Sequence, residues 1–294
     1  MSVYDKDGAL LSNIYSADGE LLNYGYDKDG SVIYRKTDTT LTVMSFNVGC
    51  FYSEWHPAPS STGDVFYLRN KGIFEKYNLD YAGLTEYYPQ IGTVSASVLM
   101  NEFFYYYYAD NVPYPSTDAC ITSGYSVQPN STPTLVRYQT QGSETRYYQK
   151  AYATIGGVTI CFIVTHLDLN SSARTAQFVE LMNAVENEDY FIITGDFNFE
   201  VVSVGDSEYN KSIQVALDKG YHSAQNADGL LMTWYSASTV AGSTRINALD
   251  NIITSQNITI TNFRRDETKL TDGICEQYNI IIDHLPVIAD LVIN

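Results

Sequence analysis

Four apolar runs in this chain each end in polar or charged side chains, and this feature narrows the folds that the chain can adopt. The runs cover residues 41–46, 161–165, 190–194 and 279–282, and they are nearly continuous rather than alternating. Such runs are typical of strands that are covered on both faces. Because an unpaired carboxylate is costly to bury, the polar groups that follow these strands predict a shared site at the edge of a sheet.

Short polar motifs follow in a fixed order along the chain. They are Ser-Phe-Asn-Val at 45–48, Gly-Leu-Thr-Glu at 83–86, Thr-His-Leu-Asp at 165–168, Gly-Asp-Phe-Asn at 195–198, Ala-Leu-Asp-Asn-Ile at 248–252 and Asp-His-Leu-Pro-Val at 283–287. Any one of them alone is typical of a turn or a cap. The ordered set indicates one assembled site.

The side chains in these motifs suit a metal-assisted attack on a phosphate ester. They supply several carboxylates, amides and two of the four histidines in the chain. Mg²⁺ takes oxygen ligands and keeps several waters, so one or two carboxylates with an amide are enough to hold it. Hydrolysis also needs an activated water, neutralised charge at phosphorus and a stabilised leaving oxygen.

From about Leu41 onward the chain resembles the endonuclease/exonuclease/phosphatase superfamily, typified by deoxyribonuclease I and abasic-site endonucleases. The family motifs are a strand-ending Asn, Gly-Leu-Gln-Glu, Thr-His-Leu, Gly-Asp-Phe-Asn, Leu-Asp-Tyr-Ile and Ser-Asp-His-x-Pro-Val. This chain departs from them at Thr85, Asn251 and Ile282, and none of these changes removes an ionisable group. The resemblance implies an α/β fold of the α+β kind, a four-layer α/β/β/α sandwich of two mixed sheets, in a catalytic domain at 39–294.

A divalent cation, Mg²⁺ or Mn²⁺, is expected at this site. Glu86 is the first choice for its carboxylate ligand, with Asn47 and Asp283 adjoining it. Carboxylate and amide oxygens are the donors that both ions favour.

The catalytic residues are expected to be His166, Asp196, Asn198, Asp250 and His284. Asp196 and Asn198 can point together at the attacking water, which Asp196 would deprotonate or orient. His284 needs a partner that fixes its tautomer. The resemblance gives that role to Asp250 and directs His166 to a non-bridging phosphate oxygen. The sequence leaves open whether Asp196 or His284 is the base.

A helix is predicted after the Thr-His-Leu-Asp motif, because apolar residues recur there at helical spacing and Ser171 or Ser172 can cap it. The family typically has Arg-x-x-Gln in this helix, and Arg174 begins the corresponding sequence here. Arg174 either reaches toward the site or is ion-paired or solvated. Asp168 is either a cap that leads into the helix or a site residue.

Net charge affects the choice of substrate. The chain has 17 basic and 34 acidic residues, which gives a net charge of −17. Nucleic-acid affinity rests largely on Lys and Arg, so this charge weighs against long duplex DNA. Candidates for a local phosphate-binding surface are Arg137, Arg146, Lys150, Arg174 and Arg245.

Three functions are compatible with the sequence. The first is a divalent-metal-dependent phosphodiester hydrolase, an endo- or exonuclease with nucleic acid as its partner. The second is a phosphatase or phospholipase-type hydrolase of lipid or sugar phosphates. The third, from another class, is a binding or attachment module with little turnover.

The N-terminal segment, residues 1–38, is predicted to be a separate repeat module. Tyr4, Tyr15 and Tyr26 recur every 11 residues, and Asp-Gly follows each of them at the same spacing. Asp-Gly is a strong signal for a tight turn between short strands, so the repeats predict β-hairpins and exclude a coiled coil. Such a module is a candidate surface for a protein partner.

No apolar stretch in the sequence is long enough to span a membrane, and the N-terminus does not read as a signal peptide. The four cysteines show no paired spacing. We therefore expect a cytoplasmic location by default, with export in a larger assembly left open.

Overall fold

The structure is a computed structural model of the 294-residue chain. It describes residues 40–48, 70–87, 99–107, 121–226, 229–234, 247–266 and 284–294, together with the backbone at 3–4, 10–11, 24–26, 32–35, 90–91, 94–98 and 108. The chain forms two compact units, Met1–Thr39 and Thr40–Asn294. Each unit is described by itself.

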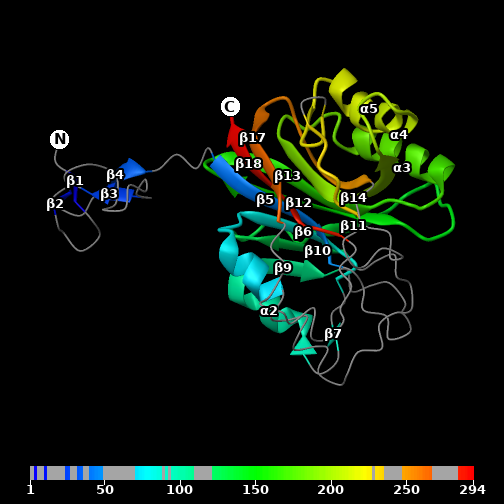
Figure 1. Cartoon of the computed structure of the whole chain (residues 1–294). Helices are drawn as coiled ribbons and strands as arrows, with labels where there is room; N and C mark the ends of the chain where they lie inside the picture. Colours follow the sequence, from blue (N-terminus) through cyan, green and yellow to red (C-terminus); the bar gives the residue numbers. More distant parts are fainter. Residues whose placement is uncertain are drawn as a thin grey trace. The chain divides into compact units, whose positions relative to one another are not determined.

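The first unit contains a four-stranded sheet with the order β2-β1-β3-β4 (Figure 1). Its strands are β1 (Val3–Tyr4), β2 (Leu10–Leu11), β3 (Tyr24–Tyr26) and β4 (Val32–Arg35). The pairs β1–β2 and β3–β4 run antiparallel, as hairpins do. The Asp-Gly dipeptides themselves lie outside the described residues.

The second unit is built on two six-stranded mixed sheets. Sheet I has the order β17-β18-β5-β6-β10-β9, with β17 (Ile258–Arg265), β18 (Val287–Ile293), β5 (Thr40–Asn47), β6 (Tyr81–Thr85), β10 (Thr122–Tyr125) and β9 (Tyr105–Tyr108). Sheet II has the order β11-β12-β13-β14-β16-β15, with β11 (Thr134–Arg137), β12 (Tyr147–Ile155), β13 (Val158–His166), β14 (Phe191–Val201), β16 (Ala248–Thr254) and β15 (His222–Ser223). Strands β7 (Gln90–Ile91) and β8 (Val94–Ser95) pair separately.

Helices cover the outer face of each sheet. They are residues 70–76, α2 (Ala96–Phe103), α3 (Ser171–Ala184), α4 (Ser207–Lys211) and α5 (Ile213–Asp218). Apolar side chains of α3, α4 and α5 pack on sheet II, and those of residues 70–76 and α2 pack on sheet I. Figure 1 accordingly shows α3, α4 and α5 on one side of the two sheets and α2 on the other. The predicted four-layer α/β/β/α fold is confirmed.

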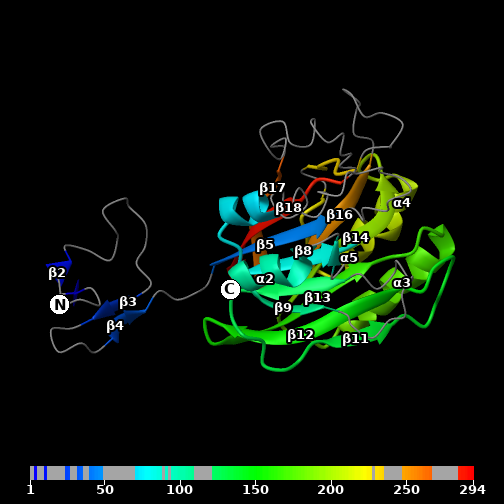
Figure 2. The same cartoon turned by 90° about the horizontal axis from the view of Figure 1, so that it is seen from below.

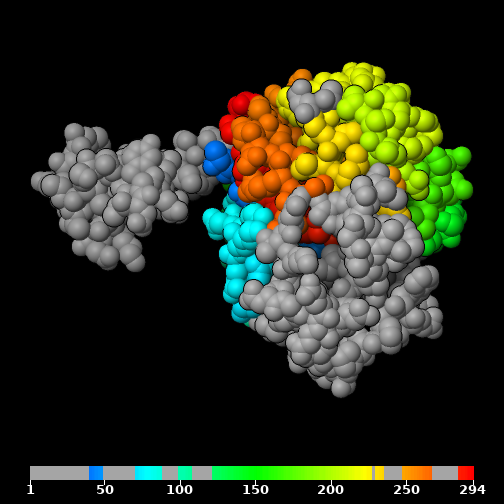
Figure 3. Space-filling model, viewed as in Figure 1, coloured from blue at the N-terminus to red at the C-terminus, as the bar shows by residue number. Residues whose placement is uncertain are grey.

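Residues 70–76 also contact the end of β17. Lys76 Nζ lies 2.9 Å from a carboxylate oxygen of the buried Asp266, which follows that strand. In Figure 3 the surface of β17 (orange) accordingly adjoins the segment from residue 70 (cyan). The contact ties the outer helix to the edge strand of sheet I.

The inner faces of the sheets change from apolar to polar along their strands. Side chains alternate between the two faces of a strand, and the residues at the apolar end fill the core between the sheets, among them Leu41, Val43 and Ile192. On the same faces, the alternation continues into Ser45 and Asn47 on β5 and into Thr194, Asp196 and Asn198 on β14. The predicted strands at 41–46, 161–165 and 190–194 are therefore present and lead to polar side chains, whereas 279–282 lies outside the described residues.

The two sheets come close together near this polar end. A Cβ atom on Gly83 of β6 would overlap the hydroxyl of Thr194 on β14 of the other sheet. Within sheet II, a Cβ atom on Gly195 would overlap the backbone oxygen of Thr165 on the neighbouring strand β13. Glycine is therefore required at these two positions of the Gly-Leu-Thr-Glu and Gly-Asp-Phe-Asn motifs. Close approach brings the strand ends of both sheets into one site.

Among the described helices, none has the length and apolar character that a membrane span requires. The cytoplasmic location stays a prediction.

Candidate active site

A cavity of about 330 Å³ opens at the polar end of the two sheets. Carboxylates, guanidinium groups, imidazoles and amides line most of it, and three apolar side chains complete the wall. Its described lining residues are Glu86, Glu144, Arg146, His166, Leu169, Arg174, Asp196, Asn198, Glu200, Trp234, Asn247, Leu249 and His284.

Most of the predicted catalytic residues meet at Asp196. Its Oδ2 accepts a hydrogen bond from Asn47 Nδ2 at 3.0 Å and lies 3.5 Å from His166 Nε2 and 3.6 Å from His284 Nε2. Its Oδ1 accepts the backbone N–H of Asn198 at 2.9 Å. Polar side chains that are far apart in the sequence thus surround the buried carboxylate of Asp196.

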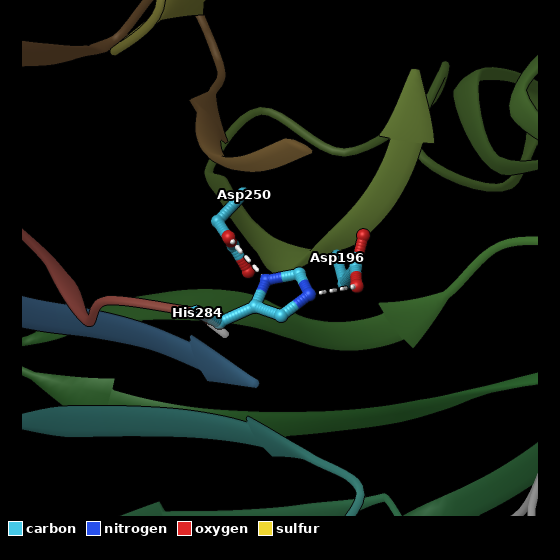
Figure 4. A group of neighbouring side chains, drawn as sticks. All are labelled: Asp196, Asp250 and His284. Atoms are coloured by element: carbon cyan, nitrogen blue, oxygen red, sulfur yellow. Dashed lines mark hydrogen bonds and ion pairs between the residues drawn. The ribbon is translucent and has the colours of Figure 1, made fainter. Parts of the chain in front are cut away.

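His284 lies between two aspartates (Figure 4). Its Nδ1 is 2.8 Å from Asp250 Oδ2, while its Nε2 faces Asp196. Asp250 accepts the Nδ1 proton of the ring, which fixes the tautomer in which Nε2 can accept one. Asp250 therefore orients the imidazole of His284 so that its other nitrogen faces Asp196.

Thr233 joins the segments that carry His284 and Asp250, and sequence reasoning missed it. Its hydroxyl accepts the backbone N–H groups of Leu249 and Asp250, both at 3.2 Å. Its carbonyl accepts the N–H of Leu285 at 3.0 Å. The only sequence signal is a polar residue between Met232 and Trp234, so nothing in the sequence marked this role.

Two residues of the site have left-handed backbone conformations. Glu86 has φ 56° and Asn198 has φ 54°. Such a conformation costs a non-glycine residue about 1–3 kcal/mol and persists only where the surroundings enforce it. Asn47 Nδ2 donates to Glu86 Oε1 at 3.0 Å, and Asn198 Nδ2 donates to the carbonyl of Leu167 at 2.8 Å. These bonds help to hold both side chains toward the cavity.

Comparison with known proteins identifies the fold. No family model matches the chain, and no curated protein matches it. A crystal structure named endonuclease/exonuclease/phosphatase from Beutenbergia cavernae DSM 12333 matches with a TM-score of 0.62 and 15% identity, over 87% of this chain and 72% of that one. The endonuclease/exonuclease/phosphatase of Bacteroides vulgatus gives 0.61 and 14%, over 87% of this chain and 100% of that one. TDP2 from C. elegans gives 0.59 and 16%, over 86% and 75%.

The chain has the fold of the endonuclease/exonuclease/phosphatase superfamily. The resemblance that the sequence motifs indicated is therefore confirmed at the level of fold. At sequence identities of 14–16%, the match shows that the strands and helices are arranged in the same way.

Burial and neighbouring charges change the acid–base behaviour of the site. Burial raises the pKa of Asp196 and the Asp250 charge raises it further, while His284 and the hydrogen bond from Asn47 act in the opposite direction, and the net shift is upward. Burial, together with Arg146 and His284, holds the pKa of His166 well below its ordinary value. Asp196 therefore accepts a proton more readily than an exposed carboxylate, and His166 is neutral at neutral pH.

The donor set fits a hard divalent cation. Carboxylate oxygens of Asp196 and Asp250 and a ring nitrogen of His284 lie within 4.8 Å of one another, and Glu86 approaches them through Asn47. Asp250 Oδ1 is buried and has no hydrogen-bond partner among the described residues. Closely spaced buried carboxylates repel one another unless a cation or a proton intervenes.

The residues whose side chains lie close enough together to share a metal ion are not the residues predicted as its ligands. Asp196, Asp250 and His284 form that group, whereas Glu86, Asn47 and Asp283 were predicted. Asn47 donates to both Glu86 and Asp196, so the two sets adjoin. Asp283 lies outside the described residues.

The predicted basic residues separate into two groups. Arg146 and Arg174 line the cavity. Arg174 is also ion-paired, because its guanidinium lies 2.9 Å from Glu208. Lys150 is not among the described residues that line the cavity, and its Nζ lies 2.8 Å from Glu188. Arg137 is an exposed residue of β11 and is not among these lining residues either. Arg245 lies outside the described residues.

Asp168 holds the loop that precedes β12, rather than lining the cavity. Its carboxylate accepts the backbone N–H groups of Ser143 at 3.3 Å, Glu144 at 3.2 Å and Asn170 at 2.7 Å. The prediction that Ser171 or a neighbouring serine caps α3 was wrong. Asn170 is the N-cap, because its side chain accepts two backbone N–H groups of the first turn.

Proposed function

We propose that this chain is a divalent-metal-dependent phosphodiester hydrolase, with nuclease activity as the first expectation. The observation that carries the proposal is the environment of Asp196. This carboxylate has a raised pKa, is buried, and lies within reach of Asn47, His166 and the His284–Asp250 pair at one end of a cavity. Groups of this kind at this spacing are what water attack on a phosphate ester requires.

Glu86 and Asn47 are the proposed ligands of Mg²⁺ or Mn²⁺, with Asp283 adjoining them. When bound, such an ion neutralises charge on the phosphate and polarises its P–O bonds. Glu86 and Asn47 both lie beside the proposed base Asp196, since Asn47 Nδ2 is 3.0 Å from Glu86 Oε1 and 3.0 Å from Asp196 Oδ2.

In the proposed reaction Asp196 orients the attacking water and accepts its proton as the water oxygen bonds to phosphorus. The P–O bond to the alcohol group then breaks, and that oxygen leaves. The raised pKa of Asp196 favours the base role, since proton transfer is most efficient when the pKa of the base approaches the working pH. Asn198 is restrained by its bonds to Leu167 and Asp196 and can hold the water.

The two histidines have separate proposed roles. His166, neutral at neutral pH because its pKa is lowered, contacts a non-bridging phosphate oxygen. His284 is the alternative base. Asp250, at 2.8 Å from its Nδ1, orients the ring, and its Nε2 lies on the side of Asp196 at 3.6 Å.

A second candidate is hydrolysis of a lipid or sugar phosphate. The cavity wall holds Glu144 and Glu200 in addition to the acidic centre, and the apolar side chains of Leu169, Trp234 and Leu249 form part of it. A long polyanion is disfavoured by this acidity and by the net charge of −17. A small ester with an apolar group suits such a wall better.

The test is a substrate panel with purified protein and Mn²⁺ or Mg²⁺. The substrates are plasmid DNA, RNA, bis-p-nitrophenyl phosphate and phosphoinositides. Hydrolysis of DNA or RNA that is lost on chelation supports the first candidate, and release of phosphate from phosphoinositides alone supports the second. Absence of hydrolysis in the whole panel contradicts both and favours the binding module.

A matched histidine pair tests the site itself. His284→Ala is expected to lower the rate about 10²–10⁴-fold, as removal of an acid–base group does. His222→Ala is the control, because His222 contacts a backbone oxygen of Gln256 and does not line the cavity. Equal rates for the two variants would contradict the assignment of His284.

A further inference from the structure

One wall of the cavity carries an ion pair that the proposed reaction does not use. Arg146 and Glu144 both line the cavity, and their side chains pair with each other. The Arg146 side chain is only 3% exposed, whereas that of Glu144 is 31% exposed. A buried guanidinium requires an anionic partner, and here a more exposed carboxylate of the same loop supplies it.

The backbone around this pair is held by other contacts. Asp168 accepts the N–H of Glu144 at 3.2 Å. The N–H of Arg146 donates to the side-chain oxygen of Gln141 at 2.8 Å. On the same loop, Gln177 of α3 donates to the carbonyl of Thr140 at 3.0 Å. None of these three contacts uses the Glu144 side chain, so they remain in place when that side chain leaves Arg146.

Arg146 also has an unused donor and a position beside the catalytic group. Its Nε is buried and has no hydrogen-bond partner among the described residues. The guanidinium lies near enough to His166 to act on that ring electrostatically. A guanidinium with a remaining N–H, next to a histidine in a cavity, is suited to an oxyanion, because its planar fork matches phosphate geometry.

We propose that Glu144 is an internal counter-ion that an incoming phosphate group displaces from Arg146. The inference rests on the proposed function, and it concerns the same cavity. Exchange of one anion for another keeps the guanidinium paired, whereas a neutral ligand would leave it buried and unpaired. Glu144 thus makes the site selective for ligands that bring a negative charge, and it weakens their binding by competing for Arg146.

The experiment is a calorimetric titration of the purified full-length protein with inorganic phosphate, in chelator and without a divalent metal. Glu144→Gln is expected to bind phosphate about tenfold more tightly than the wild type, because the gain corresponds to a released charge-assisted hydrogen bond. Glu200→Gln is the matched control, since it removes the same charge from the same cavity. Its affinity should change less than about threefold, as expected for a partly exposed charge.

The double variant Glu144→Gln with Arg146→Gln separates the pair from a general charge effect. The proposal requires the gain in affinity to disappear in it. An unchanged or weaker affinity in Glu144→Gln, an equal gain in Glu200→Gln, or a gain that survives in the double variant would overturn the proposal. Glu144→Ala leaves the backbone contact with Asp168 in place and repeats the test if the glutamine variant fails to fold.

The readout is independent of turnover. Phosphate affinity is measured without metal and without substrate, so failure of the hydrolase proposal in the substrate panel leaves this result interpretable. Conversely, a chain that hydrolyses esters but shows no Glu144-dependent gain retains the proposed function and loses only the counter-ion.

Discussion

Asp168 follows strand β13 and Asp196 lies within the neighbouring strand β14; both are buried, and their surroundings act on the pKa of each in opposite ways. Their exposed fractions are 0% and 2%. Burial would raise the pKa of Asp168, but the backbone N–H groups of Asn170, Glu144 and Ser143 hold it below its ordinary value. Burial raises the pKa of Asp196 and Asp250 adds to the effect, so that it stays above its ordinary value.

The difference shows that burial alone does not decide the direction in which the pKa of a carboxylate shifts. Asp168 receives several backbone N–H groups that stabilise its charge, and it holds a loop in place. Asp196 receives one backbone N–H group, from Asn198, and otherwise faces a carboxylate, an amide and two imidazoles. The supply of hydrogen-bond donors thus decides whether the pKa of a buried aspartate ends below or above its ordinary value.

The largest expected effect is on turnover, and it should separate the two aspartates. Asp196→Asn is expected to lower hydrolysis of bis-p-nitrophenyl phosphate about 10²–10⁴-fold, because it removes the proton acceptor. Its stability should not fall, since an uncharged side chain avoids the cost of a buried charge. Rates at saturating Mn²⁺ and urea unfolding curves check both points. An active Asp196→Asn protein contradicts the assignment.

Metal binding gives the next largest effect. The ion should stabilise the wild type by about 2.7 kcal/mol at 100 times its Kd. Glu86→Ala should lose this gain, because the proposed ligand is gone, whereas Asp168→Asn should keep it. Thermal unfolding with Mn²⁺ and with chelator measures the increments. An increment that persists in Glu86→Ala removes Glu86 from the proposed metal site.

The free energy of unfolding should fall more in Asp168→Asn than in Asp196→Asn, which is the reverse of the order expected for turnover. Asp168→Asn is expected to lower the free energy of unfolding by about 1.5–3 kcal/mol, because it weakens charge-assisted hydrogen bonds and turns an amide N–H toward backbone donors. Urea unfolding at neutral pH provides the measurement. If Asp168→Asn and Asp196→Asn are equally stable, the contrast between the two residues is wrong.

The pH dependence of stability is the smallest effect and the most direct test of the two shifts. The lowered pKa of Asp168 adds stability above its unfolded value of about 3.9, and this contribution is lost as the pH falls through the folded value. The raised pKa of Asp196 has the opposite sign: its charge costs stability at neutral pH, and the cost disappears at low pH. Unfolding from pH 3 to 7, compared with each Asn variant, should give differences that shrink toward low pH with opposite signs.

The sequence predicted the layers of the fold and most of the side chains that gather at the cavity. The four-layer fold was predicted from the resemblance to the family, with which the apolar strands are consistent. The gathering of the side chains was predicted from the strands, because apolar strands that end in polar residues put those residues at one edge of a sheet. Asn47 and Asp196 are within hydrogen-bond distance of each other for this reason, whereas His284 lies ahead of strand β18. The local pattern was enough because each motif is attached to a strand whose neighbours are fixed by the sheet.

The remaining parts of the site depend on contacts that leave no local pattern. Thr233 joins two segments through one hydroxyl and one carbonyl, and any polar residue in a loop would look the same in the sequence. Asp168 could be a cap or a site residue until its backbone donors were known. Asn251, which replaces a family tyrosine, donates to Ser223 at 2.9 Å, a contact between strands that no spacing rule predicts.

Strand β18 is an interior strand of sheet I, between β17 and β5, although it follows every other described strand in the chain (Figure 2). His284 lies three residues before its first residue, Val287. While the chain is being synthesised, β5 consequently has an open hydrogen-bonding edge until this strand emerges from the ribosome. The segment that closes the sheet also carries His284, so the cavity lacks this side chain until the sheet is complete.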